Sequence, residues 1–219
     1  MSTRGMPPSL IFGLIARAAY PLVLLLVVAS PAAATPDLLA RMAEVNPNLH
    51  AFTATMHANV VMKSFPFLSA SLTGTYYHKE PDKTKVVFTS GVPMIASQFD
   101  KLYAHIESPS QWPSVYEITV SGDDGTSTTY RLVPRKHGNV DHIEAKVDDK
   151  TATVTSMRWV YANGGYAEMT NHYGAVDGNT VVTSQTGHVE EPGYVADIAS
   201  TIDHYAINPD LADSVFAGQ

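Results

Sequence analysis

The sequence predicts a mainly β domain in which about eleven antiparallel strands, joined by hairpins, form one sheet with a dry face. Three observations lead to this fold class: side chains that alternate between polar and apolar, frequent turn signals, and a single amphipathic helix. So many consecutive strands in one sheet must curl. The residues alone leave three architectures open, namely a barrel, a sandwich, or a half-barrel covered by a helix.

The clearest alternation lies between Leu49 and Thr89. Its first strand has polar side chains at most odd positions, and apolar ones at the even positions Phe52, Ala54, Met56, Ala58, Val60 and Met62. This period of two is typical of a strand with one wet and one dry face.

The alternation resumes in the next strand and continues through a predicted hairpin. The apolar positions of this part are Leu68, Ala70, Leu72, Tyr76, Val86 and Phe88. Between them stands Glu80-Pro81-Asp82-Lys83, in which the proline fixes φ for a turn and the aspartate can bond its own backbone. We therefore expect a hairpin at this site.

A short helix is expected before the first strand. Thr35-Pro36-Asp37 combines a capping hydroxyl, a proline at the first helical position and an early acid, and Asn46-Pro47-Asn48 ends the helix. Its apolar stripe consists of Leu38, Leu39, Met42 and Val45. A helix this short is stable only when packed, so we expect its stripe to face the same space as Met56 of the first strand.

The rest of the chain indicates strands and turns in one domain, without repeats or linkers. Further strands are expected at 94–99, 101–107, 116–121, 126–133, 143–147, 151–161, 166–173, 180–189 and 196–207. Strong turn signals separate them, for example Ser121-Gly122-Asp123-Asp124-Gly125 and Asn163-Gly164-Gly165.

The first 34 residues are typical of a secretory signal peptide. Arg4 and Arg17 precede an apolar run, and Ala32-Ala33-Ala34 forms a small-residue cleavage site. An uncleaved anchor is the alternative, but the run is short for a membrane span. We expect a soluble periplasmic protein with one domain over 35–219.

Charge and cysteine content exclude several classes of function. The 219 residues are 45% hydrophobic and carry 14 basic against 21 acidic residues; without Arg4 and Arg17, 12 against 21 leaves a net charge of −9. An acidic chain without a basic run is not expected to bind nucleic acid. The absence of cysteine excludes disulfides, thiolate metal sites and a lipidated N-terminal cysteine.

No pattern in the sequence points to catalysis or to a metal. Among nine histidines, His137 and His142 flank a turn next to Asp141, whereas His50 and His57 differ in parity. Neither pair has the convergent spacing of a zinc site. There is no nucleophile elbow and no glycine-rich phosphate loop. We therefore expect a binding protein rather than an enzyme, with no cofactor.

The apolar residues carry a positive signal instead. Flexible, polarizable methionines suit surfaces that adapt to varied apolar ligands, and the chain has Met42, Met56, Met62, Met94, Met157 and Met169. One helix is little material to fill a large curved sheet, so an apolar cavity is expected. An ordinary core filled by side chains is the alternative.

Several short motifs, taken in their order along the chain, resemble the LolA-like periplasmic lipoprotein carriers. They follow the N-terminal helix and long first strand, and comprise Gly74-Thr75-Tyr76-Tyr77, Glu80-Pro81-Asp82, Phe99-Asp100-Lys101-Leu102-Tyr103, Tyr130-Arg131-Leu132-Val133-Pro134, and the closing segment from Asn208-Pro209 to Phe216. The third resembles the "DGK-x-LW-x-Y" hairpin of the family, and the fourth its "Y-x-L-x-P" strand. The resemblance covers most of the mature chain.

The resemblance implies an incomplete (half-open), highly curved antiparallel β-barrel with the N-terminal helix as a lid. Its interior would bind an acyl chain of a lipoprotein or another lipid, with membrane-bound donor and acceptor proteins as partners. The candidate lipid-binding residues are Leu38, Leu39, Met42, Val45, Phe52, Met56, Val60, Met62, Leu72, Tyr76, Val86, Phe88, Ile118, Leu132, Trp159 and Met169.

The chain departs from the family pattern at two places. The carriers have a basic residue before the hairpin proline, where this chain has Glu80 preceded by Lys79. They also have lid helices where the stretch from Tyr103 to Tyr130, with Pro109 and Pro113, leaves room for little beyond a hairpin. We therefore expect a reduced lid. The alternative to a lipid carrier or sensor is a structural or interaction module of the same fold without a ligand.

Overall fold

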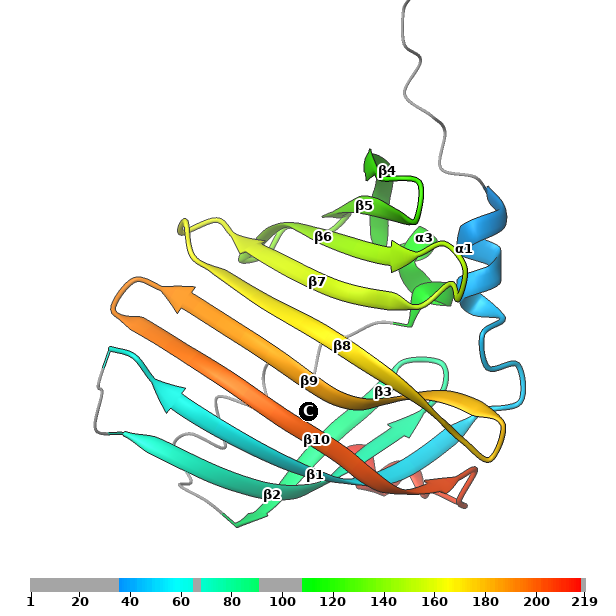
Figure 1. Cartoon of the computed structure of the whole chain (residues 1–219), viewed down its shortest axis with the longest axis vertical. Coiled ribbons are helices and arrows are strands. Elements are labelled where there is room, and N and C mark those ends of the chain that lie inside the picture. The colour runs from blue at the N-terminus through cyan, green and yellow to red at the C-terminus, as the bar shows by residue number, and fades with distance from the viewer. Residues whose placement is uncertain (1–35, 65–67, 91–107, 218–219) are drawn as a thin grey trace, which may run out of the picture. The chain divides into compact units, whose positions relative to one another are not determined.

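The computed structural model describes residues 36–64, 68–90 and 108–217, and ten strands in this part form one antiparallel sheet. The strand order is β3-β2-β1-β10-β9-β8-β7-β6-β5-β4, and Figure 1 shows the run from β4 through β8 and β10 to β1 and β2. The end strands β3 and β4 are not paired with each other, so the sheet does not close into a barrel. The predicted mainly β, half-open antiparallel architecture is confirmed.

The first meander is β1 (Ala51–Met62), β2 (Ser69–Lys79) and β3 (Lys83–Ser90). The second meander is β4 (Tyr116–Asp123), β5 (Ser127–Pro134), β6 (Val140–Asp148), β7 (Val154–Tyr161), β8 (Tyr166–Val176), β9 (Asn179–Glu191) and β10 (Tyr194–Ile207). The helical segments are α1 (Pro36–Ala43), η1 (Pro109–Gln111), α3 (Trp112–Val115) and η2 (Asp213–Phe216). The strands expected at 94–99 and 101–107 and the signal segment 1–34 lie outside the described residues.

Alternation in the first meander produces the predicted burial. The even positions of β1 from Ala54 to Met62 are buried, whereas His57, Asn59 and Val61 between them are exposed. The turn at Glu80 to Asp82 joins β2 to β3 as a hairpin, as predicted.

Pairing of β1 with β10 joins the two meanders into one sheet. Asn208, directly after β10, secures this junction, because its side-chain oxygen accepts hydrogen bonds from the backbone N–H groups of His50 (2.8 Å) and Ala51 (3.1 Å). Its side-chain nitrogen donates to the carbonyl of Asn48 at 2.7 Å. Asn208 has a φ of 51°, a left-handed conformation that asparagine tolerates better than most residues. One residue therefore fixes where the first strand begins beside the last.

Lysines hold the closing segment, residues 208–217, to the β2–β3 hairpin. Lys79 donates to the Leu211 carbonyl and to the Asp213 carboxylate, both at 2.8 Å, and Lys83 lies 2.9 Å from the same carboxylate. These ammonium groups lower the pKa of Asp213 to about 2. Lys79, noted above for its place next to Glu80, therefore contacts the closing segment.

Turn carboxylates in the second meander are held mainly by hydroxyl and backbone groups. Asp124 accepts hydrogen bonds from the hydroxyls of Thr126 (2.7 Å) and Ser127 (2.8 Å) and from Lys146 (3.0 Å). These donors lower the pKa of Asp124, with the Thr126 hydroxyl as the largest cause. The predicted β4–β5 turn is thus stabilised by its own aspartate.

The stretch before β4 contains more helix than the sequence predicted. For residues 109–115 the expectation of little beyond a hairpin is wrong, because η1 and α3 form two consecutive helical turns there. Pro109 and Pro113 each stand in the first turn of their segment, a position that needs no backbone donor. No helix within the described ranges is long and apolar enough to cross a membrane.

Candidate functional site: the inner face of the sheet

One face of the sheet can be followed from strand to strand by register, because residues directly opposite each other in neighbouring strands share a face. The row of opposite residues that includes Val60 is uncharged and apolar on all nine strands from β2, through β1 and β10, to β4. It consists of Ala70, Val60, Ile198, Gly187, Met169, Met157, Ala145, Tyr130 and Val120. We call the face that carries this row the inner face.

Two groups of buried side chains share the inner face. The strand cluster comes from β1, β2, β3 and β10 and contains Ala54, Met56, Ala58, Val60, Met62, Ala70, Leu72, Val86, Ala196 and Ile202. The helix cluster comes from α1, α3 and β4 to β7 with the turn after β6, and contains Leu38, Met42, Trp112, Tyr116, Tyr130, Leu132, Ile143, Ala145, Val147, Ala152 and Met157. The helical segments thus contribute to only one of the two groups.

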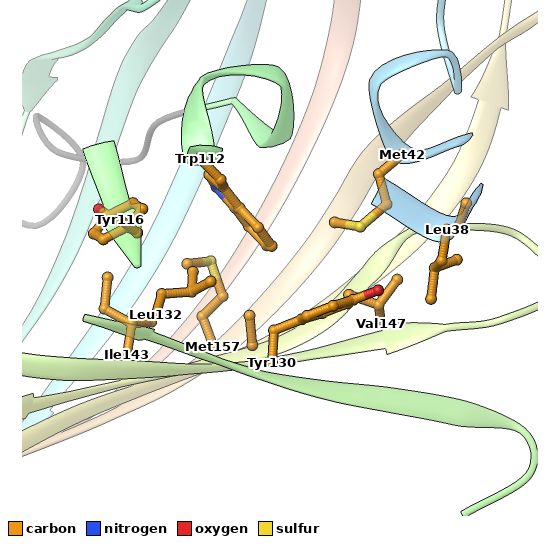
Figure 2. Close-up of a cluster of buried hydrophobic side chains, with 11 residues drawn as sticks. Leu38, Met42, Trp112, Tyr116, Tyr130, Leu132, Ile143, Val147 and Met157 are labelled. Atoms are coloured by element: carbon orange, nitrogen blue, oxygen red, sulfur yellow. The ribbon is translucent and has the colours of Figure 1, made fainter. Parts of the chain in front are cut away.

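Side chains from α1 and α3 fill the helix cluster. Figure 2 shows Trp112 and Leu38 pointing from their helices toward the sheet, where Tyr130 and Val147 lie beneath them. Trp112 is 1% exposed and Tyr130 is fully buried, so the helical segments cover the sheet at this point, whereas Ile118 and Trp159 of the same half stay partly exposed. In this half of the sheet, helical side chains are therefore part of the core.

Polar contacts in the last turn of α1 and just beyond it hold the helix in this position. Arg41 donates to the carbonyls of Asp149 (2.9 Å) and Lys150 (3.0 Å), which form the turn between β6 and β7. Beyond the helix, Asn46 pairs with the backbone of Thr180 at the start of β9 by two hydrogen bonds of 2.8 Å. The predicted lid helix is therefore fastened to the second meander.

Large apolar side chains around the strand cluster stay partly exposed. They include Phe52, Tyr76, Phe88, Ile198 and Tyr205. Gly74 lies directly opposite both Met56 and Phe88, and a Cβ added there would come within 2.9 Å of the Phe88 ring. The missing side chain thus lets that ring lie close to the strand. This half of the inner face combines small buried alanines with large side chains that remain accessible.

An aromatic group closes one end of the strand cluster. The Phe52 ring lies 5.3 Å from both Tyr76 and Tyr205 and 5.1 Å from His78, measured between ring centroids. Burial, with a smaller contribution from Tyr173, raises the pKa of Tyr76 to about 12, and burial lowers the pKa of His78 despite the nearby Glu80. These polar groups are therefore neutral at physiological pH, which suits contact with an apolar ligand.

A short polar row separates the two clusters on the middle strands. Asn171, Gln185 and Ser200 lie directly opposite one another on β8, β9 and β10. The next residue along this row is Ala58 on β1, whose side chain is buried in the strand cluster. The row therefore lies on the inner face, two residues along each strand from Met169, Gly187 and Ile198.

The structure distributes the candidate lipid-binding residues over both halves of the inner face. Met56, Val60, Met62, Leu72 and Val86 belong to the strand cluster, with Phe52, Tyr76 and Phe88 packed against it. Leu38, Met42 and Leu132 belong to the helix cluster, with Leu39, Val45, Ile118 and Trp159 packed against it. Met169 lies between them, in contact with Gln185. The helix stripe and Met56 are thus in different clusters, contrary to our expectation of one shared space.

Sequence reasoning missed the residues that close the helix cluster. Trp112 had a usable signal, because it stands between two prolines in the first turns of helical segments. Tyr130 and Val147 lie in strands with visible alternation, but nothing in the sequence showed that a helix would cover them. Burial of Ile202 depends on the β1–β10 pairing, which no local sequence pattern predicts.

Some histidines within the described residues, namely His50, His142, His188 and His204, lie close to carboxylates, whereas His57 and His78 lie beside threonine hydroxyls. His188 is 2.6 Å from Asp197, and His204 is 2.6 Å from Asp203. Across the described parts of the chain, no three His, Asp or Glu side chains are placed together as metal ligands.

Comparison with known proteins identifies the fold. Neither a protein-family model nor a curated protein sequence matches the chain. Among solved structures, a DUF1329 family protein from Desulfovibrio piger has a TM-score of 0.57 and 14% identity, over 83% of this chain and 95% of its own. These values show similarity of fold at a level of identity that carries no further conclusion.

Two further solved structures have a similar fold. A LolA superfamily protein from Nitrosomonas europaea has a TM-score of 0.55 and 8% identity, over 83% of this chain and 96% of its own. An outer membrane lipoprotein-sorting protein domain from Vibrio parahaemolyticus has a TM-score of 0.56 and 10% identity, over 82% and 95%. The predicted LolA-like fold is confirmed.

Proposed function

We propose that this protein is an exported binding protein that holds an acyl chain of a lipoprotein or another lipid against the inner face of its sheet. The observation that carries the proposal is the contrast between the two clusters. Helical segments contribute buried side chains over β4 to β7, whereas within the described residues none does so over β1, β2, β3 and β10. Five of the eight partly exposed side chains around the strand cluster are aromatic, against one of eight around the helix cluster. Partly exposed apolar surface of this kind is where a nonpolar ligand gains most by leaving water.

The fold supports the same proposal. The half-open antiparallel sheet of this chain has a fold similar to those of a LolA superfamily protein and of a domain named for lipoprotein sorting. From the lipoprotein sorting that one of those names states, we infer for this chain the binding of an acyl chain, the role of a carrier or sensor, and membrane-bound donor and acceptor proteins as partners. This assignment needs neither catalysis nor a cofactor.

Export is part of the proposal and rests on the sequence. Residues 1–34 would be removed as a signal peptide, and residues 35–219 would act as the lipid-binding domain in the periplasm. An N-terminal sequence beginning at Thr35 in protein from the periplasmic fraction would support this, and a retained N-terminus in the membrane fraction would contradict it.

A structural or interaction module without a ligand is the second candidate. The helix cluster favours it, because Trp112 and Met42 show that side chains alone can close half of the inner face. The two candidate functions differ at the strand cluster, because only the first requires a ligand to bind there.

Lysine substitutions on the two faces of β10 distinguish the two candidate functions. Ile198→Lys places an ammonium on the inner face next to the strand cluster, whereas Thr201→Lys places it on the exposed outer face of the same strand. In delipidated protein, Ile198→Lys should weaken binding of a fluorescent fatty-acid probe roughly tenfold or more, since the charge would lie against apolar chains. Thr201→Lys should leave binding unchanged, with circular dichroism confirming that both variants fold. Absence of probe binding to the unmodified protein would favour the second candidate.

A further inference from the structure

The polar row interrupts an otherwise apolar surface without an evident structural need. Ala58 and Ala196 show that small apolar side chains are accommodated on this face, one directly opposite Ser200 and one on the same strand. Gln185 and Ser200 are nevertheless polar, and they are only 6% and 4% exposed. A buried polar group is costly unless it is hydrogen-bonded, so the partners of the row decide what it can do.

Backbone contacts fix the orientation of the two amides. The Asn171 side-chain nitrogen donates to the carbonyl of Val154 at 2.9 Å, which leaves its oxygen to accept from the Gln185 Nε2 at 2.9 Å. The second hydrogen of Gln185 Nε2 points to the sulfur of Met169, 3.1 Å away. A thioether is a weak acceptor, so of these two hydrogen bonds of Gln185 Nε2 the one to Met169 is the weaker.

Ser200 adds a hydroxyl that has no partner. In the described part of the chain two buried side-chain oxygens lack a hydrogen bond, the Ser200 Oγ and the Tyr130 hydroxyl. Tyr130 lies beneath the helical segments in the helix cluster, whereas Ser200 stands two residues along β10 from Ile198, which is partly exposed. Of the two hydroxyls, Ser200 is therefore the one next to accessible surface.

We propose that Ser200 and Gln185 together bind the carbonyl oxygen of an ester or amide that joins an acyl chain to the rest of the ligand. This inference rests on the proposed function and specifies which part of an acylated molecule is recognised. Side chains directly opposite in neighbouring strands are close enough for two donors to converge on one acceptor. The carbonyl replaces the Met169 sulfur as acceptor for Gln185 and gives the Ser200 hydroxyl its missing partner.

The geometry also explains how the carbonyl reaches a buried hydroxyl. Met169 is unbranched and flexible, so its side chain can move aside when its weak contact with Gln185 is exchanged for a stronger one. The acyl chain then continues over Ile198 toward the strand cluster, on the same inner face. Polar recognition at the row and apolar burial beside it would thus position one ligand.

A pair of lipids that differ only in the carbonyl tests this site. Monopalmitoyl glycerol is an ester, and hexadecyl glycerol is the ether of the same chain length without a carbonyl. In competition with a fluorescent fatty-acid probe on delipidated protein, the ester should displace the probe at about three- to tenfold lower concentration than the ether. Ser200→Ala should abolish this preference by weakening the ester alone, and it should fold normally because it removes an unsatisfied group.

Thr201→Ala is the matched control, since it removes an exposed hydroxyl from the outer face of the same strand and should keep the preference for the ester. Equal displacement by ester and ether in the unmodified protein, or an unchanged preference in Ser200→Ala, would overturn the inference while leaving acyl-chain binding intact. Failure of the unmodified protein to bind the probe or either lipid would instead overturn the proposed function.

Discussion

The strand cluster and the helix cluster lie on one face of one sheet, but they differ in the elements that contribute their side chains. Over β4 to β7, the helical residues Trp112, Leu38 and Met42 pack on buried strand residues, while Trp159 and Ile118 beside them stay partly exposed. Over β1, β2, β3 and β10 the buried residues include four alanines, and large side chains such as Phe88 and Tyr205 remain partly exposed at the margin. The same alternation in sequence therefore produces a core with helical side chains in one half, and in the other half a core bordered by partly exposed aromatic side chains.

This difference separates stability from binding. A helix that fills the inner face stabilises the fold by excluding water, but it also occupies the space that a ligand would need. The helix cluster should therefore carry more of the free energy of unfolding, and the strand cluster more of the ligand affinity. Substitutions in the two halves should have correspondingly different effects.

The largest expected effect is that of Trp112→Ala. Loss of this buried ring should lower the free energy of unfolding by about 3–5 kcal/mol, while the probe affinity of the protein that remains folded stays unchanged. Urea denaturation and probe titration measure the two quantities. The other tryptophan, Trp159, is only partly buried in the same cluster, so Trp159→Ala should cost about 1–2 kcal/mol. Similar stability in the two variants, or a large loss of affinity in Trp112→Ala, would contradict the separation.

A smaller effect of opposite sign is expected for Tyr130→Phe. The Tyr130 hydroxyl is buried in the helix cluster without a partner, and removing an unsatisfied group should raise the free energy of unfolding by about 1 kcal/mol. The preference for an ester over an ether should persist, in contrast to Ser200→Ala. Loss of that preference in Tyr130→Phe would show that the two halves of the inner face are not functionally distinct.

The smallest effect concerns two carboxylates at the surface. Asp213 depends on Lys79 and Lys83, whereas the largest cause at Asp124 is a threonine hydroxyl. Added salt screens charge pairs, so it should raise the pKa of Asp213 from about 2 toward its ordinary value of 3.8 and change that of Asp124 less. Because the folded-state pKa is depressed, Asp213 stabilises the closing segment above pH 3.8 and loses this effect as the pH falls through about 2.

Carboxyl NMR titrations at low and high salt measure both pKa values. In Lys79→Ala the pKa of Asp213 should rise even at low salt, because this ammonium is the largest cause of the shift. A salt-independent pKa of Asp213 would indicate that the closing segment is held by something other than charge.

Local sequence signals predicted most of the sheet. Alternation fixed the dry face of β1, and the proline and aspartate of the β2–β3 turn fixed that hairpin, because both depend only on neighbouring residues. The helix start at Pro36 and its apolar stripe were also readable, as were the turns centred on Asp124 and Gly164. Each of these features is decided within a few residues.

Long-range packing could not be predicted in the same way. Which strands the helix stripe would cover depends on contacts such as those of Arg41 with Asp149 and Lys150, more than a hundred residues away. The polar row likewise arises only when β8, β9 and β10 come into register. The sequence thus indicated the candidate lining residues, but not their division between two clusters.

The most direct test of acyl-chain binding over the strand cluster uses a stearic acid with a spin label on its chain. In methyl-labelled protein, the paramagnetic label should broaden the NMR signals of Ile198 and Ile202 beside or within the strand cluster. The signal of Ile143, buried in the helix cluster, should be broadened much less. Broadening of Ile143 as strong as that of Ile198, or no broadening of any isoleucine at saturating ligand, would contradict the account.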